Sequence, residues 1–253
     1  MSRLMKVRML LVVCGVLSLS LGASAQRGRA GGAAPAAQTV AGQDLTGCWV
    51  SVVTEDWRWR MVVPAKGDLA SLPLTAEGRR VANEWDPAKE TADDRCKAYG
   101  AGGIMRVPTR LHITWDNPNA LKVETDAGTQ TRLFGFGGGA AAPAERTLQG
   151  VSVASWEYGG GRAPRAGGPT PVGQLKVVTT RMKAGWLRRN GVPYSENAVI
   201  TEYFNRLDQP DGSSFLVVTT TVEDPIYLNA RFTVSSNFKK EADGSKWKPT
   251  PCE

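Results

Sequence analysis

The residue best suited to proton transfer is the single histidine of the chain, His112. It lies in the segment TRLHITW, where apolar residues alternate with Arg110, His112 and Thr114. This alternation is typical of a β-strand, so we expect Arg110 and His112 to share one face of it. Imidazole titrates near neutral pH and would serve as a general acid or base if that face lined a polar cavity. If the face meets solvent, His112 is a surface residue, which is the commoner place for a lone histidine on a polar strand face.

The catalytic hypothesis needs a partner for His112, and the segment ITEYF supplies two candidates, Glu202 and Tyr203. Adjacent strand residues point to opposite faces, so only one of the two can enter a given cavity. A lyase, isomerase or hydrolase built on a barrel would use His112 with that residue. The sequence contains no GxSxG, HExxH or phosphate-loop motif, and a single histidine argues against a zinc site. We therefore expect no metal and no cofactor.

A ligand-binding hypothesis comes from the segment TGCWVSVVTEDWRWR, which places Trp49, Trp57 and Trp59 at odd positions. If the whole segment is extended, the three indole rings share one face and could form the wall of a cavity. Ordinary core packing is the alternative, and buried tryptophans more often have that role. Arg110 and Arg132 are candidate polar anchors, because a guanidinium fork donates two hydrogen bonds to a carboxylate. The expected ligand is a small apolar or aromatic molecule held in a barrel lumen.

Segments with a period of two, rich in valine, threonine, isoleucine and aromatic residues, recur along the chain and predict β-strands. Turn-forming sequences such as DNPN and QPDG separate several of them. We therefore predict an all-β fold, an antiparallel meander that closes into a lipocalin-like barrel. The predicted strands cover residues 47–54, 57–63, 109–115, 120–126, 129–136, 148–157, 174–182, 197–207, 214–223 and 231–239.

One short helix interrupts the strand pattern, in the segment LTAEGRRVANEWDP. Thr75 is a suitable N-cap, Glu77 favours the positive end of the helix, and Pro87 ends it. Two inserts rich in glycine, alanine and proline, residues 135–145 and 159–171, lack the composition of a core and predict flexible loops.

The N-terminal residues 1–25 have the composition of a signal peptide, with a basic start, an apolar stretch and a small-residue cleavage site. Residues 26–43 predict a disordered leader, which leaves residues 44–253 as a single barrel domain. No later stretch approaches the ~18 apolar residues of a membrane span, so we expect a periplasmic or secreted protein. Of the net charge of +7, five positive charges precede Asp44. The small remainder shows no concentrated basic segment, so we do not expect nucleic acid as a partner.

Three cysteines follow the predicted cleavage site, namely Cys48, Cys96 and Cys252. Export permits a disulfide, and pairing Cys96 with Cys252 would tie down the C-terminus. Cys48 lies in a strand pattern beside Trp49 and is expected to be a small core residue.

A series of short segments extends over most of the chain after residue 44. The segments are DLTGCWV (44–50), LTAEG (74–78), the loop at Cys96, LQGVSVASWEY (148–158), QLKVVTT (174–180), NGVPYSENAVITEYF (190–204), TVEDPIYL (221–228) and FKKEADG (238–244). As a set they resemble a family of uncharacterised exported bacterial proteins. The resemblance implies an all-β, lipocalin-like barrel and brings no established activity with it. The insert between Glu157 and Gln174 departs from the short turn of that family.

Three hypotheses follow from the sequence. The first is an exported barrel that binds a small molecule in its lumen. The second is an enzyme on the same barrel, with His112 as acid or base. The third is a structural protein of the cell envelope, which would have a filled lumen and an exposed apolar patch.

Overall fold

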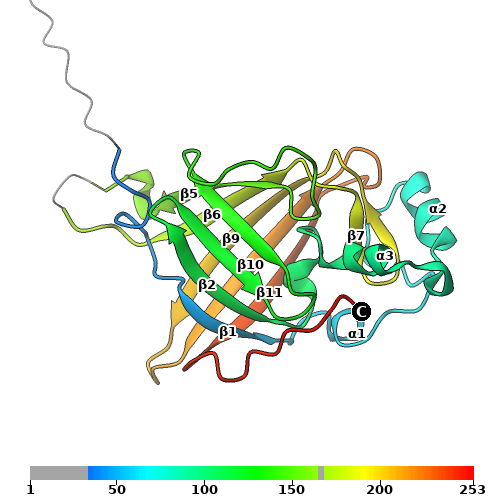
Figure 1. Ribbon diagram of the computed structural model, residues 1–253, viewed down its shortest axis with the longest axis horizontal. Helices are drawn as coiled ribbons and strands as arrows, with labels where there is room; N and C mark the ends of the chain where they lie inside the picture. The colour runs from blue at the N-terminus through cyan, green and yellow to red at the C-terminus, as the bar shows by residue number, and fades with distance from the viewer. Residues whose placement is uncertain (1–33, 165–167) are drawn as a thin grey trace, which may run out of the picture. The chain divides into compact units, whose positions relative to one another are not determined.

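A computed structural model describes residues 34–164 and 168–253. In this part of the chain, nine strands form a closed barrel with the neighbour order β1-β11-β10-β9-β6-β5-β4-β3-β2 (Figure 1). The predicted all-β barrel is confirmed. The barrel strands are β1 (Gly47–Val52), β2 (Arg110–Asn117), β3 (Ala120–Thr125), β4 (Thr131–Phe136), β5 (Val151–Tyr158), β6 (Gly173–Thr180), β9 (Val199–Asp208), β10 (Ser214–Glu223) and β11 (Phe232–Glu241), and β7 (Gly185–Arg188) pairs with β8 (Val192–Tyr194) in a separate hairpin.

One pair of neighbouring strands is parallel: β4 and β5, with Phe134 opposite Ser152. The predicted antiparallel meander is wrong at this pair and holds for the others. Nine strands that alternate in direction cannot close a ring, so one neighbouring pair must share a direction. The connection from β4 to β5 therefore returns along the barrel. Asn117 Nδ2 donates to Gly139 O at 3.1 Å and holds the start of this connection against the turn between β2 and β3.

The predicted helix is present as α2 (Ala76–Glu84), where Thr75 Oγ1 accepts a hydrogen bond from the Gly78 N–H at 3.0 Å. The strand predicted for residues 57–63 is wrong, because Trp57–Arg60 forms helix α1. Asp56 has φ 50° and ψ 28°, a left-handed conformation that turns the chain out of the direction of β1. None of the helices in the described residues has the length and apolar character of a membrane span. The remaining helices are α3 (Ala92–Cys96) and the 3₁₀ helices η1 (Pro87–Lys89), η2 (Lys97–Tyr99), η3 (Ile104–Arg106) and η4 (Gly159–Gly161).

Different parts of the chain cover the two ends of the barrel. At the end where β1 finishes and β11 begins lie α1, α2, α3 and the β7–β8 hairpin (Figure 1). We call it the helical end. At the opposite end, which we call the leader end, the chain enters β1 and leaves β11.

Residues 35–43, predicted to be part of a disordered leader, pack against the leader end instead. Trp156 Nε1 donates to Ala37 O at 3.2 Å, and the hydroxyl of Tyr158 donates to Val40 O at 2.6 Å. The prediction of disorder is wrong for these residues. It rested on side-chain composition, whereas the backbone carbonyls of Ala37 and Val40 make the contacts. The predicted signal peptide lies outside the described residues.

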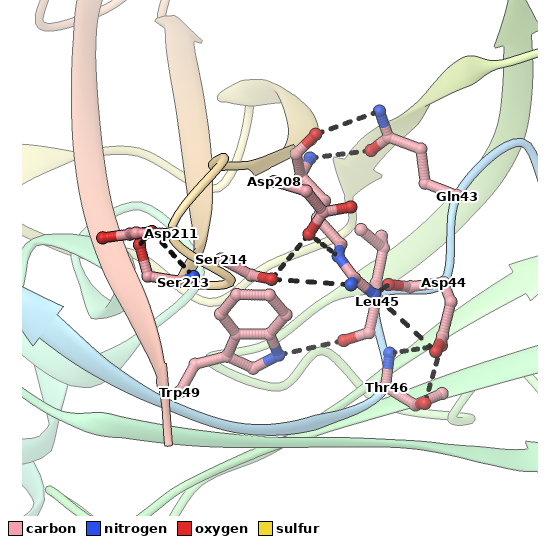
Figure 2. A network of polar contacts seen from close by, with 10 residues as sticks. Gln43, Asp44, Leu45, Thr46, Trp49, Asp208, Asp211, Ser213 and Ser214 are labelled. Carbon is pink, nitrogen blue, oxygen red and sulfur yellow. Dashed lines mark hydrogen bonds and ion pairs between the residues drawn. The ribbon is translucent and has the colours of Figure 1, made fainter. Parts of the chain in front are cut away.

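Arg206 on β9 holds the end of this segment through hydrogen bonds to Gln43, Asp44 and Asp208. Figure 2 labels these three partners. The backbone N–H of Arg206 donates to Gln43 Oε1 at 2.7 Å, and its Nη1 donates to Asp44 O at 2.8 Å. Its Nε donates to Asp208 Oδ1 at 2.8 Å. The guanidinium thus connects the segment before β1 to the far end of β9.

Side chains fill the lumen of the barrel. Trp49 is fully buried there, and its Nε1 donates to Leu45 O at 3.0 Å (Figure 2). On β10 every second residue from Ser214 to Val222 is buried, as expected for a strand with one face inward. The lumen is therefore a packed core, which also contains Leu111, Ile113, Leu121, Val123, Phe134, Leu175, Val177, Phe204, Leu216, Val218 and Phe238.

The expected disulfide joins Cys96, the last residue of α3, to Cys252, with their Cα atoms 5.1 Å apart. It fixes the C-terminal tail, whose Thr250 N–H donates to Asp126 O at 2.9 Å. Cys48 is free and half-buried, with a side chain on the face of β1 opposite to that of Trp49. The expectation that Cys48 belongs to the core is wrong, because Trp49 takes the inward position.

Candidate anion-binding site

The three tryptophans expected to form one wall lie in three different environments. Trp49 is buried inside the barrel, Trp57 is 66% exposed on α1, and Trp59 is half-buried beneath the side chain of Arg188. The strand that would have aligned them ends at Val52. The structure therefore brings no tryptophan wall together.

The polar face of β2 is on the outside of the barrel. Leu111, between Arg110 and His112, is fully buried in the lumen, so its two neighbours point outward. Arg110 Nε lies 2.9 Å from Glu241 Oε2. The His112 side chain is 44% exposed, and its Nδ1 lies 3.4 Å from Glu124 Oε2. His112 thus occupies the surface position that was the alternative to catalysis.

The two proposed partners of His112 lie elsewhere on the barrel. Glu202 is fully buried in the lumen, whereas Tyr203 points outward from the same strand, β9, with Lys176 Nζ 5.7 Å from its ring centroid. At least three strands separate β9 from β2 in either direction around the barrel. The structure does not bring His112 together with Glu202 or Tyr203.

Arg132 and Glu202 form an ion pair in the lumen. Arg132 Nη1 donates to Glu202 Oε1 at 3.0 Å, and Arg132 Nη2 donates to Glu202 Oε2 at 2.6 Å. Both side chains are fully buried. Thr179 Oγ1 accepts a further hydrogen bond from Nη2 at 3.2 Å and is itself 2.8 Å from Ser152 Oγ. The guanidinium fork of Arg132 was expected to hold the carboxylate of a ligand, but it binds the carboxylate of Glu202 instead.

A second group of buried arginines lies at the helical end. Arg60 belongs to α1, Arg106 to η3, and Arg188 is the last residue of β7. Their exposed fractions are 2%, 6% and 4%. Arginine is rarely buried to this degree unless its charge is paired. We call these three residues the arginine cluster.

Two members of the cluster are paired with acids. Arg60 forms an ion pair with Glu55 and donates from Nε to Arg106 O at 2.9 Å. Arg106 Nη2 donates to Asp56 Oδ2 at 2.9 Å. The left-handed turn at Asp56 therefore presents two consecutive carboxylates to the cluster.

Arg188 has a different environment. Its Nη1 donates to Ala70 O at 2.9 Å, and its guanidinium stacks on Trp59 with the carbon atom Cζ 4.4 Å from the ring centroid. Among the described residues, no carboxylate lies within ion-pair distance of Arg188. Stacking on an aromatic face is favourable for a guanidinium, but it supplies no counter-charge.

The electrostatics of the cluster are unfavourable as the structure stands. Burial, together with the neighbouring charge of Arg106, lowers the pKa of Arg188 from its usual 12.5 to about 10. Burial also lowers the pKa of Arg60, and Glu55 only partly opposes the effect. Each arginine keeps one buried N–H without a partner, at Arg60 Nη2, Arg106 Nη1 and Arg188 Nε. A buried donor left unpaired costs about 1–3 kcal/mol, so the cluster favours the binding of an acceptor or an anion.

A cavity of about 880 Å³ opens beside Arg188. The cavity is lined by Gly67, residues 69–73, the start of β11, Arg79 of α2 and Arg231. Three arginines face this cavity against a single acid, Asp56. Arg231 Nε donates to Glu223 Oε1 at 2.7 Å, and Arg79 is exposed to solvent, so Arg188 is the buried arginine of this wall that lacks an ion-pair partner. The lining also includes Leu69, Leu72, Pro73, Phe232 and Val234, which give it an apolar side.

Sequence reasoning missed this site because it is assembled from distant segments. Arg60, Arg106 and Arg188 come from WRWR, IMRVP and WLRR, and no spacing relates them. The sequence carried no signal for the stacked guanidinium, because Arg188 stacks on Trp59, which is 129 positions away along the chain.

Comparison with protein-family models finds no match, and searches of the curated proteins and of the solved structures find none either. Within residues 34–164 and 168–253, no group of three histidine, cysteine or acidic side chains is arranged to hold a metal ion. The geometry of the arginine cluster therefore carries the functional argument.

Proposed function

We propose that the protein binds a small organic acid in the 880 Å³ cavity, with Arg188 as the main anchor. The observation that carries the proposal is the burial of Arg188 without a carboxylate partner at the wall of an open cavity. Burying an unpaired charge is costly, and a ligand carboxylate would remove that cost. Arg188 would take in this cavity the role that the sequence analysis gave to Arg110 and Arg132.

The chemistry of the cavity indicates the ligand class. The guanidinium of Arg188 suits a carboxylate, because a planar fork can donate two hydrogen bonds to two oxygens. The apolar side of the cavity, formed by Leu69, Leu72 and Phe232, suits a hydrocarbon or aromatic body. The volume is ample for a small acid. The proposed ligand is thus an aromatic or aliphatic acid, bound at the helical end rather than in the lumen.

Export is part of the proposal. It rests on the composition of residues 1–25 and on the segments that resemble exported bacterial proteins. Cell fractionation tests it: the protein should appear in the periplasm or medium in a form shortened by 25 residues, and an uncleaved cytoplasmic chain would contradict it.

Native mass spectrometry of the gently purified protein tests the binding proposal. We expect a bound small acid with the wild-type protein and none with Arg188→Met. Arg80→Met is the matched control, because Arg80 lies on α2 outside the cavity and pairs with Glu77 and Glu84. A ligand that remains on Arg188→Met, or an empty wild-type protein that binds neither benzoate, hexanoate nor succinate, would overturn the proposal.

One observation favours the structural role as a second candidate. The lumen is filled, and three apolar residues within a six-residue stretch, Trp57, Met61 and Val62, are exposed, with exposed fractions of 66%, 57% and 60%. A patch of this kind is typical of an interaction surface. Sedimentation of the wild type and of Trp57→Ser tests self-association through it: a wild-type dimer that Trp57→Ser dissociates would support this role, and two monomers would remove it.

A further inference from the structure

A second, much smaller cavity lies in the arginine cluster. Its volume is about 20 Å³, which is enough for one water molecule or one monatomic ion. Arg188 lines this cavity as well as the large one, whereas Arg60 and Arg106 line only the small one. The two cavities are therefore neighbours that can be altered separately.

The side chains around the small cavity offer donors and no acceptor. The lining consists of Trp59, Arg60, Ala98, Gly103, Arg106, Val107, Leu187, Arg188 and Arg189. Arginine and tryptophan have only donors, and the other side chains are apolar. Three of the arginines contribute the unpartnered buried N–H groups at Arg60 Nη2, Arg106 Nη1 and Arg188 Nε.

A water molecule suits such a lining poorly. It accepts two hydrogen bonds, so one of three donors would stay unpaired, and its own hydrogens would find no side-chain acceptor. A monatomic anion accepts hydrogen bonds from every direction and needs no acceptor. The donor set therefore discriminates between the two occupants.

The charge of the cluster also favours an anion over a water molecule. Arg106 is a neighbour of both Arg60 and Arg188, and its charge disfavours the charged form of each. Glu55 and Asp56 offset two of the three positive charges. Arg189, half-buried beside the same cavity, adds a further positive charge without an ion-pair partner among the described residues, and Asp68, whose charge also acts on Arg188, is paired with Arg58. The positive charge around the cavity therefore exceeds the negative charge, which favours an anion.

We propose that the small cavity binds one chloride ion between the guanidinium groups of Arg60, Arg106 and Arg188. The proposal shares Arg188 with the proposed function, yet it uses a different cavity and a different ligand. By balancing the charge of the cluster, the ion would hold α1, η3 and β7 together at the helical end.

Crystals of the wild-type protein grown in sodium bromide test the proposal directly, because bromide replaces chloride and gives an anomalous signal. We expect one strong peak between the three guanidinium groups. Density without an anomalous signal at that position, or no density, would overturn the proposal. This experiment needs no variant and does not depend on the organic acid.

Thermal unfolding provides the second test. The Tm of the wild type should rise saturably with sodium chloride, by about 3 °C or more, relative to sodium gluconate at equal ionic strength. Arg60→Met should lose this difference, and Arg231→Met, which alters only the large cavity, should keep it. Equal chloride responses in the wild type and Arg60→Met would contradict the proposal. Loss of acid binding in Arg231→Met with an intact chloride response would separate the two sites.

Discussion

Arg132 in the lumen and Arg188 at the helical end are both buried arginines, but their surroundings are opposite. Arg132 has a bidentate carboxylate partner, Glu202, and a threonine hydroxyl. Arg188 has a tryptophan ring, one backbone carbonyl and no carboxylate. Both arginines keep a buried Nε without a hydrogen-bond partner, but the charge of Arg132 is balanced within the chain by Glu202, and the charge of Arg188 has no acid within ion-pair distance among the described residues. A buried pair that is closed on itself is structural, whereas a buried charge that is left open at a cavity indicates a binding site.

The same substitution at the two positions gives the largest expected contrast. Arg132→Met leaves the Glu202 carboxylate buried and unpaired, so it should lower the free energy of unfolding by about 3–5 kcal/mol. Urea unfolding followed by circular dichroism measures this loss. The double variant Arg132→Met/Glu202→Leu should recover most of it, because no buried charge remains. A double variant as unstable as Arg132→Met would show that the defect comes from packing rather than charge.

Arg188→Met should have a far smaller effect on the same measurement. It removes an unpaired buried charge and orphans no carboxylate, so in sodium gluconate, without chloride, the free energy of unfolding should stay within about 1 kcal/mol of the wild type or rise. Loss of stacking on Trp59 limits the gain. If Arg188→Met were as destabilising as Arg132→Met, the distinction between a structural and a binding arginine would fail.

A conservative change at Arg188 sharpens the comparison. Arg188→Lys keeps the charge and loses the planar fork, so the affinity for a carboxylate should fall about tenfold, as expected for one charged hydrogen bond. Titration of tryptophan fluorescence with benzoate measures the change. Affinity equal to that of the wild type would mean that charge alone, without fork geometry, holds the ligand.

The smallest effect is expected at His112. Its side chain is partly exposed on the outside of β2, so His112→Ala should change the free energy of unfolding by no more than about 0.5 kcal/mol and leave acid binding unchanged. Chemical unfolding and the same fluorescence titration check both points. A strong effect on binding would revive a functional role for the outer face of the barrel.

Much of the fold could be predicted because strand parity is local. Alternation places Leu111 inside and His112 outside, and it gives Glu202 the same face as Ile200 and Phe204. The cap at Thr75 is likewise a local feature. These predictions need only the chain direction and a period of two.

The rest depends on single conformations or distant contacts. The left-handed conformation of Asp56 ends the extended chain, so α1 forms where the alternating tryptophans predicted a strand. The alternation of Trp57 and Trp59 gives no sign of this turn. The parallel pair arises from the number of strands in the closed ring, which no single segment contains. In the arginine cluster, Arg60 is 46 positions before Arg106, and Arg106 is 82 positions before Arg188. No local sequence pattern therefore groups the three residues.

Isothermal titration calorimetry of the wild type and Arg188→Met with benzoate, hexanoate and succinate tests the central claim most directly. We expect saturable binding of at least one acid at one site per chain, reduced about 100-fold or more in Arg188→Met, as for two lost charged hydrogen bonds. Arg80→Met, measured alongside, should bind like the wild type. Equal binding by the wild type and Arg188→Met would contradict the claim that the unpaired charge of Arg188 anchors the ligand.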